Sequence, residues 1–214
     1  MINPAYKFMQ FIKSKKHFRK QENVYPKMLQ GAENRLYIMR KEKRTMDKKV
    51  SELLNAQINK EFYSAYLYLD FANYFERRGL SGFAHWYEVQ AQEERDHAML
   101  FYRYLLNNGE NVTLGTVDAP KTEGKRDSDV LEAALAHEKY VTALVNDIYA
   151  AAYAVKDFRT MQFLDWFVKE QGEEEKNASD LITKMQLFGS DAKGLYMLDN
   201  ELKARVYSAP SLVL

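Results

Sequence analysis

The sequence of 214 residues contains no cysteine. Without cysteine the chain can form no disulfide, zinc ribbon or cysteine-ligated iron–sulfur cluster, and it has no thiol nucleophile. No run of about 18 apolar residues occurs, although a membrane-spanning helix requires one. A glycine-rich phosphate loop and a convincing internal repeat are missing as well. Thiol chemistry and a membrane span are therefore excluded from the expected functions.

The net charge of +1 hides a division between two segments. Residues 1–45 carry 12 of the 31 basic residues and 3 of the 30 acidic residues, a net charge of +9. Residues 46–214 hold the other 19 basic and 27 acidic residues, a net charge of −8. An acidic body attracts cations through its summed field. We predict a basic N-terminal extension over residues 1–45 and one helical domain over residues 46–214.

The basic extension has scattered aromatic residues and no clear helical or strand period. We expect a disordered tail, or translated sequence upstream of a true start at Met46. A targeting peptide is an alternative, although the segment has a single serine and no convincing cleavage signal. A nucleic-acid-binding arm is another, because basic clusters with interleaved aromatics bind phosphate and stack on bases. We favour neither nucleic acid nor a membrane as a partner.

Apolar residues recur at steps of three and four from residue 46 onward, which predicts long amphipathic helices. The predicted helices span about residues 46–78, 81–107, 129–155 and 159–187, with a short fifth helix over 195–207. Residues 110–127 form a long connection, which can enter the third helix at the end where the second began. The expected helix caps are Thr45, Ser81, Ser128 or Asp129, Asp157, and Ser190 or Asp191.

Each of the four long helices places acidic residues in its apolar stripe near mid-length. In the second helix Glu94 and His97 are three residues apart and share one face. A carboxylate and an imidazole on one face can chelate a metal ion. The first and third helices contribute Glu61 and Glu138. The fourth helix contributes a cluster of Glu170, Gln171, Glu173 and Glu174.

Each of these signals alone has a purely structural explanation. A lone glutamate in an apolar stripe often reaches solvent, and His97 alone is more often a hydrogen-bonded core residue. The acidic run at residues 173–175 alone would be a solvated face. Acids from four helices at one level, however, would repel one another strongly without cations between them. Carboxylates with one imidazole and no thiolate favour iron or manganese over a closed zinc site.

Four stretches resemble bacterial non-haem ferritins: residues 59–64, 91–97, 137–138 and 163–176. The resemblance covers residues 46–207. It implies an all-α, ferritin-like four-helix bundle with a long crossover between helices 2 and 3 and a short C-terminal fifth helix. It also implies a cytoplasmic iron-storage protein with ferroxidase activity, which oxidises iron(II) with dioxygen or peroxide. The iron(III) mineral would be stored inside a hollow homo-oligomer of 24 subunits, with the fifth helix at the four-fold axes.

The resemblance also implies which residues hold a di-iron centre. Glu61, Glu94 and His97 would hold the first iron. Glu138 and Glu174 would hold the second iron, with Glu94 bridging the two ions.

Further residues take roles near this centre in the same family. Gln171 would lie beside the second iron. A third iron site would be formed by Glu93, Glu170 and Glu173. Tyr68 matches the family's tyrosine near the di-iron centre, a possible electron donor.

The departures from related families narrow the interpretation. The chain has a single Glu-x-x-His motif and offers Gln171-x-x-Glu174 in the fourth helix, as in ferritin proper and unlike bacterioferritin or rubrerythrin. Bacterioferritin has a haem-binding methionine where this chain has Arg95, so we do not expect haem. Two rivals stay open: a DNA-protecting mini-ferritin that uses the basic arm, and a structural cage subunit with a vestigial centre. The mini-ferritin family places its metal ligands between subunits and lacks a C-terminal fifth helix.

Overall fold

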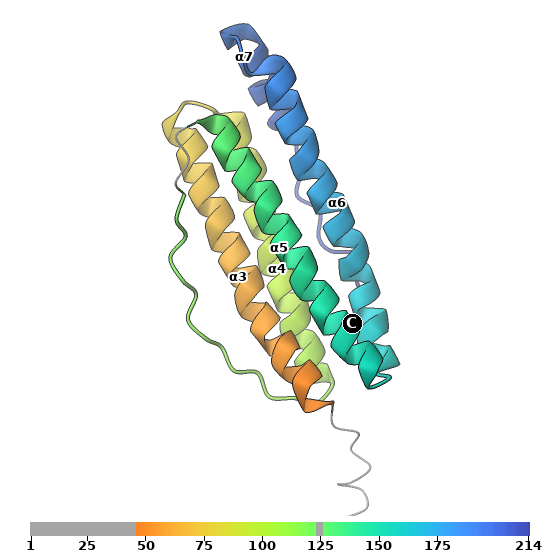
Figure 1. Ribbon diagram of the computed structural model, residues 1–214. Helices are drawn as coiled ribbons and strands as arrows, with labels where there is room; N and C mark the ends of the chain where they lie inside the picture. The colour runs from red at the N-terminus through yellow and green to blue at the C-terminus, as the bar shows by residue number, and fades with distance from the viewer. Residues whose placement is uncertain (1–45, 123–125) are drawn as a thin grey trace, which may run out of the picture. The chain divides into compact units, whose positions relative to one another are not determined.

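A computed structural model describes residues 46–122 and 126–214, so the predictions for residues 1–45 fall outside the described part. All regular secondary structure in that part is α-helical, which confirms the predicted fold class. The helices are α3 (Lys48–Arg77), α4 (Ser81–Asn107), α5 (Asp127–Ala154), α6 (Phe158–Phe188) and α7 (Ala192–Leu202) (Figure 1). None of them is long and apolar enough to cross a membrane.

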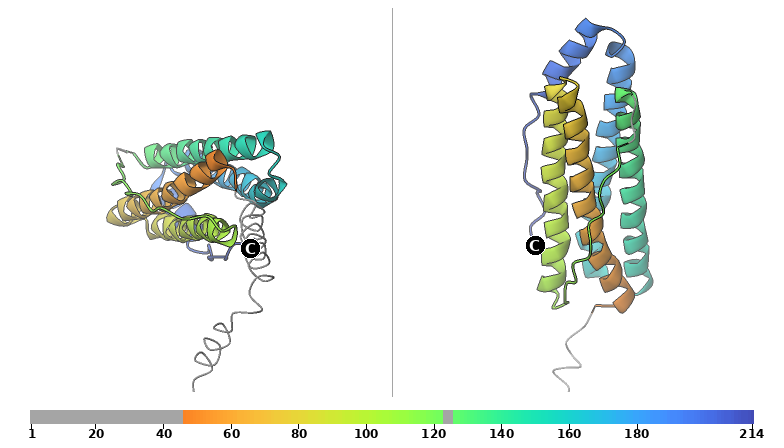
Figure 2. Two further views of the ribbon diagram at one scale, coloured as in Figure 1. Left: turned by 90° about the horizontal axis from the view of Figure 1, so that it is seen from below. Right: turned by 90° about the vertical axis from the view of Figure 1, so that its left-hand side faces the viewer.

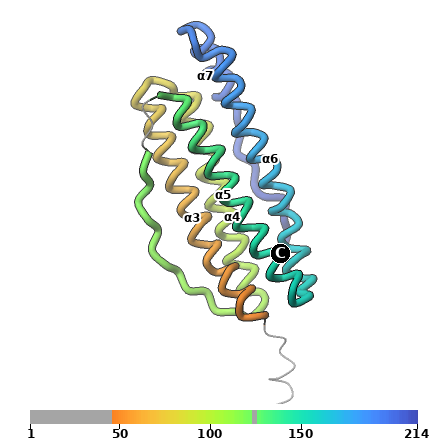
Figure 3. The backbone as a smooth tube through the Cα atoms, viewed as in Figure 1, coloured from red at the N-terminus to blue at the C-terminus, as the bar shows by residue number. Residues whose placement is uncertain are grey.

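The four long helices form two antiparallel hairpins, α3 with α4 and α5 with α6, joined by a long crossover (Figure 3). The crossover runs along α3, so that α5 begins at the end of the bundle where α4 begins (Figures 1 and 2). Two asparagines one turn apart on α3 hold it. Asn55 exchanges two hydrogen bonds of 2.8 Å with the Thr113 backbone, and Asn59 bonds to Gly115 and Thr116. The predicted direction of the third helix is confirmed.

Helices α3, α6 and α7 begin where an aspartate at the N-cap accepts backbone N–H groups that have no partner within the helix. Asp47 caps α3, whereas the predicted cap Thr45 lies outside the described residues. Asp157 caps α6 and Asp191 caps α7, as predicted. For α5 the prediction was wrong by two or three residues, because the helix starts at Asp127.

The short fifth helix ends at Leu202 rather than at the predicted Tyr207. Beyond it, residues 203–214 continue without helix and run beside α4 (Figure 2, right). We call residues 203–214 the C-terminal segment.

The start of α4 depends on α7. Ser81 does not cap α4 as predicted, since the N-cap position is Leu80 and no local side chain bonds to the free N–H groups. The buried carboxylate of Asp199 in α7 accepts them instead, from Gly82 at 2.7 Å and Phe83 at 3.1 Å. A Cβ atom on Gly82 would lie 1.7 Å from the Asp199 carbonyl oxygen. Helix α7 can therefore dock here only because residue 82 has no side chain.

The apolar stripes of the helices meet in two separate clusters. One lies where α3 ends and α4 begins and contains Phe71, Phe75 and Phe83, and the other contains Phe101 and Phe167 toward the opposite end. Between the clusters lies a layer of buried polar side chains. Its members are Gln57, Glu61, Ser64, Gln90, Glu94, His97, Glu138, Gln171 and Glu174. We call this set the polar layer.

Two glycine-to-alanine substitutions should have opposite effects on stability. Gly82→Ala should destabilise the protein by about 2 kcal/mol or more, because the new methyl group clashes with the α7 backbone. At Gly172, by contrast, a Cβ would meet nothing within 4 Å outside the backbone of its own helix. Gly172→Ala should stabilise α6 by about 0.5–1 kcal/mol. Denaturant unfolding of the two variants measures both effects. An equal loss of unfolding free energy in both would contradict the close docking of α7 on Gly82.

Candidate metal centre

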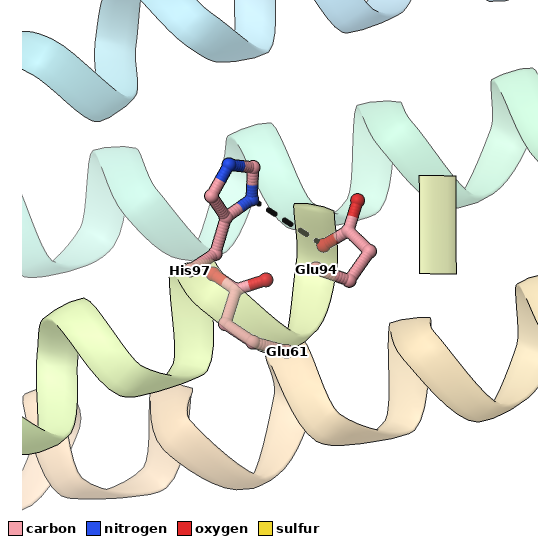
Figure 4. Close-up of side chains that lie close together, drawn as sticks. All are labelled: Glu61, Glu94 and His97. Atoms are coloured by element: carbon pink, nitrogen blue, oxygen red, sulfur yellow. Dashed lines mark ion pairs between the residues drawn. The ribbon is translucent and has the colours of Figure 1, made fainter. Parts of the chain in front are cut away.

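Three ionisable side chains from two helices converge at the middle of the bundle. Glu61 comes from α3, and Glu94 and His97 come from α4 (Figure 4). Potential ligand atoms of the three lie within 4.8 Å of one another, and each residue is at most 2% exposed. The His97 Nδ1 atom lies 3.6 Å from Glu94 Oε2. This group thus combines the carboxylate and imidazole donors expected from the i, i+3 spacing.

A second group draws on the other hairpin. Glu138 from α5 and Glu174 from α6 meet Glu94, again with ligand atoms within 4.8 Å of one another. Glu94 belongs to both groups. The predicted neighbour Gln171 donates from Nε2 to Glu138 Oε2 at 3.2 Å, and the Tyr68 hydroxyl donates to Glu138 Oε1. The two groups therefore form one continuous site that spans all four long helices.

The remaining predicted ligands lie beside this site. His97, Glu170 and Glu174 form a third group of potential ligands, with Glu170 half-buried. Glu173 is exposed, while Glu93 is half-buried in an ion pair with Arg205. Over residues 46–122 and 126–214, neither Glu93 nor Glu173 is a member of any of the three groups.

Electrostatics divides the first group into an ion pair and one extra acid. Burial alone would lower the pKa of His97, but the ion pair with Glu94 outweighs it and raises the pKa to about 9. Burial would raise the pKa of Glu94, yet the ion pair with His97 holds that pKa below the usual value. Glu61 has no such partner, so burial and the Glu94 charge raise its pKa well above normal.

The second group is short of positive charge. Burial raises the pKa of Glu138 to about 7. Burial, then the charges of Glu94 and Glu138, raise the pKa of Glu174 well above its usual value. Two oxygens in the polar layer, Glu61 Oε2 and Glu174 Oε2, are buried and have no hydrogen-bond partner. Buried polar atoms without partners are rare in native proteins and require an explanation. Each lies in one of the two groups, so a cation in each group would supply the missing partner.

The structure reveals two amides that the sequence reasoning did not single out. Gln57 donates to Glu61 Oε1 at 2.9 Å. Gln90 donates both to Glu94 Oε1 at 3.2 Å and to Glu174 Oε1 at 2.9 Å. Each glutamine precedes its helical partner by four residues, so a polar residue at that spacing was the available signal. These amides hold one oxygen of each acid and leave the other oxygen facing the site.

Comparison with known proteins agrees with this geometry. Residues 51–188 match the family model described as a ferritin-like domain. A bacterial non-heme ferritin of Bacteroides fragilis is 38% identical over 160 residues, which cover 75% of this chain and 99% of the relative. A probable bacterial non-heme ferritin-like protein of Haemophilus influenzae is 36% identical over 73% of this chain and 95% of its own length.

The chain belongs to the ferritin family. The open pore ferritin of Archaeoglobus fulgidus, a solved structure, is 42% identical and has a TM-score of 0.74 over 76% of this chain and 99% of its own. The ferritin-like bundle with a C-terminal short helix is thereby confirmed. In this ferritin the polar layer lies where the four long helices face one another.

Removal of one buried acid should stabilise the metal-free ferritin. In Glu174→Gln the new amide N–H group can donate to the neighbouring acids Glu94 and Glu138, with which Glu174 shares a group. We expect a gain of about 1–3 kcal/mol at pH 8. The pKa of Glu174 is raised in the folded state, so folding favours its protonated form and parent stability falls as pH rises above 4.5. The gain should therefore vanish at pH 4.

Denaturant unfolding in the presence of a chelator measures this gain. Glu173→Gln removes the same charge from an exposed site on the same helix and should change stability by less than about 0.5 kcal/mol. A Glu174→Gln variant less stable than the parent at pH 8 would show that the buried acid is satisfied without a metal.

Proposed function

We propose that this ferritin stores iron and oxidises iron(II) at a di-iron centre in the polar layer of each subunit. The observation that carries the proposal is the pair of acid groups that share Glu94, each with a buried carboxylate oxygen lacking a partner. Carboxylates with one imidazole are donors that suit iron and manganese. The site holds no thiolate, because the sequence contains no cysteine.

The two groups define the proposed ligands. Glu61, Glu94 and His97 would hold the first iron, and Glu138 and Glu174 the second, with Glu94 bridging. The four carboxylates would balance the positive charge of the two ions. The attraction between ions and carboxylates would in turn offset the free-energy cost of burying the acids.

The surrounding side chains would position these ligands and carry protons. Gln171 donates to Glu138 from beside the second position. The pKa of His97, raised to about 9 by Glu94, means that its imidazole is protonated at neutral pH without metal. Iron(II) must therefore displace a proton from His97 to gain this ligand. Iron uptake should release protons from the polar layer.

The redox chemistry is supplied by the iron itself. Each iron(II) gives up one electron, and dioxygen or peroxide accepts the electrons. The negative charge of the carboxylates favours iron(III) over iron(II). Tyr68 would serve as a nearby electron donor, since its hydroxyl contacts Glu138 and its ring stacks on Tyr87 at a centroid distance of 5.7 Å. Glu93, Glu170 and Glu173 would hold a third iron.

Storage requires an enclosed assembly, and we propose a homo-oligomeric shell of 24 subunits in the cytoplasm. Exposed apolar residues support self-association, because large apolar patches on a surface mark interaction sites. Tyr66 and Leu69 on α3 are 57% and 50% exposed, and Tyr196 and Met197 on α7 are 67% and 62% exposed. The α7 pair would lie at the four-fold contacts of the shell.

Loss of the first group should abolish fast iron oxidation. The double variant Glu94→Ala with His97→Ala removes the bridging carboxylate and the imidazole. The initial rate of iron(II) oxidation should fall by more than about a hundredfold. Mixing metal-free protein with iron(II) in air and following the di-iron(III) absorbance measures this rate.

The matched control is Glu88→Gln, which removes a charge from an exposed position on α4. Its oxidation rate should equal that of the parent. An unchanged rate in the double variant would remove the proposed site from the mechanism.

A further inference from the structure

The C-terminal segment contacts both α4 and α6, the helices that carry most of the proposed ligands. Tyr207 donates a hydrogen bond to Asp96 of α4, and Trp166 of α6 donates to the Ser211 hydroxyl at 3.0 Å. Leu212 packs against the apolar cluster of Phe101 and Phe167. The segment is therefore held at several points along its length.

Arg205 is the one cation of this segment that faces the acids of α4. Its guanidinium forms an ion pair with Glu93 Oε2, donates to Gln90 Oε1 at 2.9 Å and donates to the Trp86 carbonyl at 3.1 Å. It also stacks over the Trp86 ring, 4.1 Å from the centroid. The Arg205 side chain is only 14% exposed and that of Glu93 only 19%. This many directed contacts distinguish Arg205 from a solvated surface cation.

The contacts of Arg205 lead directly into the polar layer. Gln90 accepts from Arg205 with its oxygen and donates from its nitrogen to Glu94 and Glu174. Glu93, which Arg205 pairs, is one of the three residues proposed for the third iron. The guanidinium therefore supplies positive charge where the proposed function places a third metal ion.

We propose that Arg205 and a third metal ion compete for Glu93, so that the third site fills only when Arg205 leaves this carboxylate. The inference rests on the proposed function, because it assumes metal in the two groups around Glu94. A divalent ion on the free oxygen of Glu93 would lie next to a guanidinium, and the two positive charges repel. Arg205 is thus a positioning residue that makes the third ion bind more weakly than the first two. Occupancy of the third site therefore depends on the position of Arg205 in the C-terminal segment.

Zinc(II), which undergoes no redox reaction, tests this competition without any activity measurement. Calorimetric titration of the metal-free parent should give two tight equivalents per subunit and a weaker third. In Arg205→Gln the third zinc ion should bind about tenfold more tightly, because one hydrogen bond to a charged group contributes about that much to affinity. The affinities of the first two ions should not change. Lys193→Gln removes the same charge from an exposed site on α7 and should leave all three equivalents as in the parent.

A second pair of measurements assigns the third equivalent to Glu93. Adding Glu93→Gln to Arg205→Gln should remove the tightened binding. The position of Arg205 in the parent can also be followed by the fluorescence of Trp86, on which its guanidinium stacks. The chain has two tryptophans, so Trp166→Phe leaves Trp86 as the only tryptophan, whose emission is excited selectively over that of tyrosine at long wavelength. Its fluorescence should change at the third zinc equivalent, when the guanidinium leaves the ring.

The outcomes separate the two proposals. Suppose that two tight equivalents bind and that the affinity of the third is the same in the parent and Arg205→Gln, or shifts equally in Lys193→Gln. Either result would overturn the role of Arg205 and leave the di-iron proposal intact. Trp86 emission that stays constant through the third equivalent would also overturn it. Absence of tight zinc binding in every variant would overturn both.

Discussion

The polar layer depends on one electrostatic constraint: four glutamates are buried at one level between two apolar clusters, and the only cationic group within that layer is His97. His97 is paired with Glu94 alone. Glu61 and Glu174 instead have a raised pKa, and each has one carboxylate oxygen without a hydrogen-bond partner. A bundle built for stability would place apolar side chains here, since a buried ion pair rarely outperforms them. This imbalance supports the proposal that metal ions complete the layer.

The topology of the chain follows from the need to surround this layer with four helices. The crossover along α3 brings α5 in at the same end as α4, so Glu94 and Glu138 approach from helices that run in the same direction. Helix α7 then closes that end through Asp199, which caps α4 across the fold. The C-terminal segment returns along α4 and carries Arg205 to Glu93. The side chain that caps α4 and the cation that pairs with Glu93 thus both come from the part of the chain that follows the four long helices.

The sequence predicted what depends on local spacing. Helical periodicity located the long helices, and the spacing of Glu94 and His97 placed them on one face. The convergence of Glu61, Glu138 and Glu174 could be expected only because unpaired acids in four apolar stripes need a common partner.

The contacts that were missed join distant parts of the chain. Asp199 accepts from a helix N–H group 117 residues earlier, and Arg205 pairs with an acid 112 residues earlier. No local pattern marks such pairs, so Ser81 was preferred as the cap and the C-terminal segment carried no role. Anomalous scattering at the iron edge, from crystals soaked in iron(II), would locate bound iron in the polar layer directly. Two peaks are expected in each subunit, one among Glu61, Glu94 and His97 and one among Glu94, Glu138 and Glu174. Iron bound only at the protein surface, with no peak in the polar layer, would contradict the proposed di-iron centre.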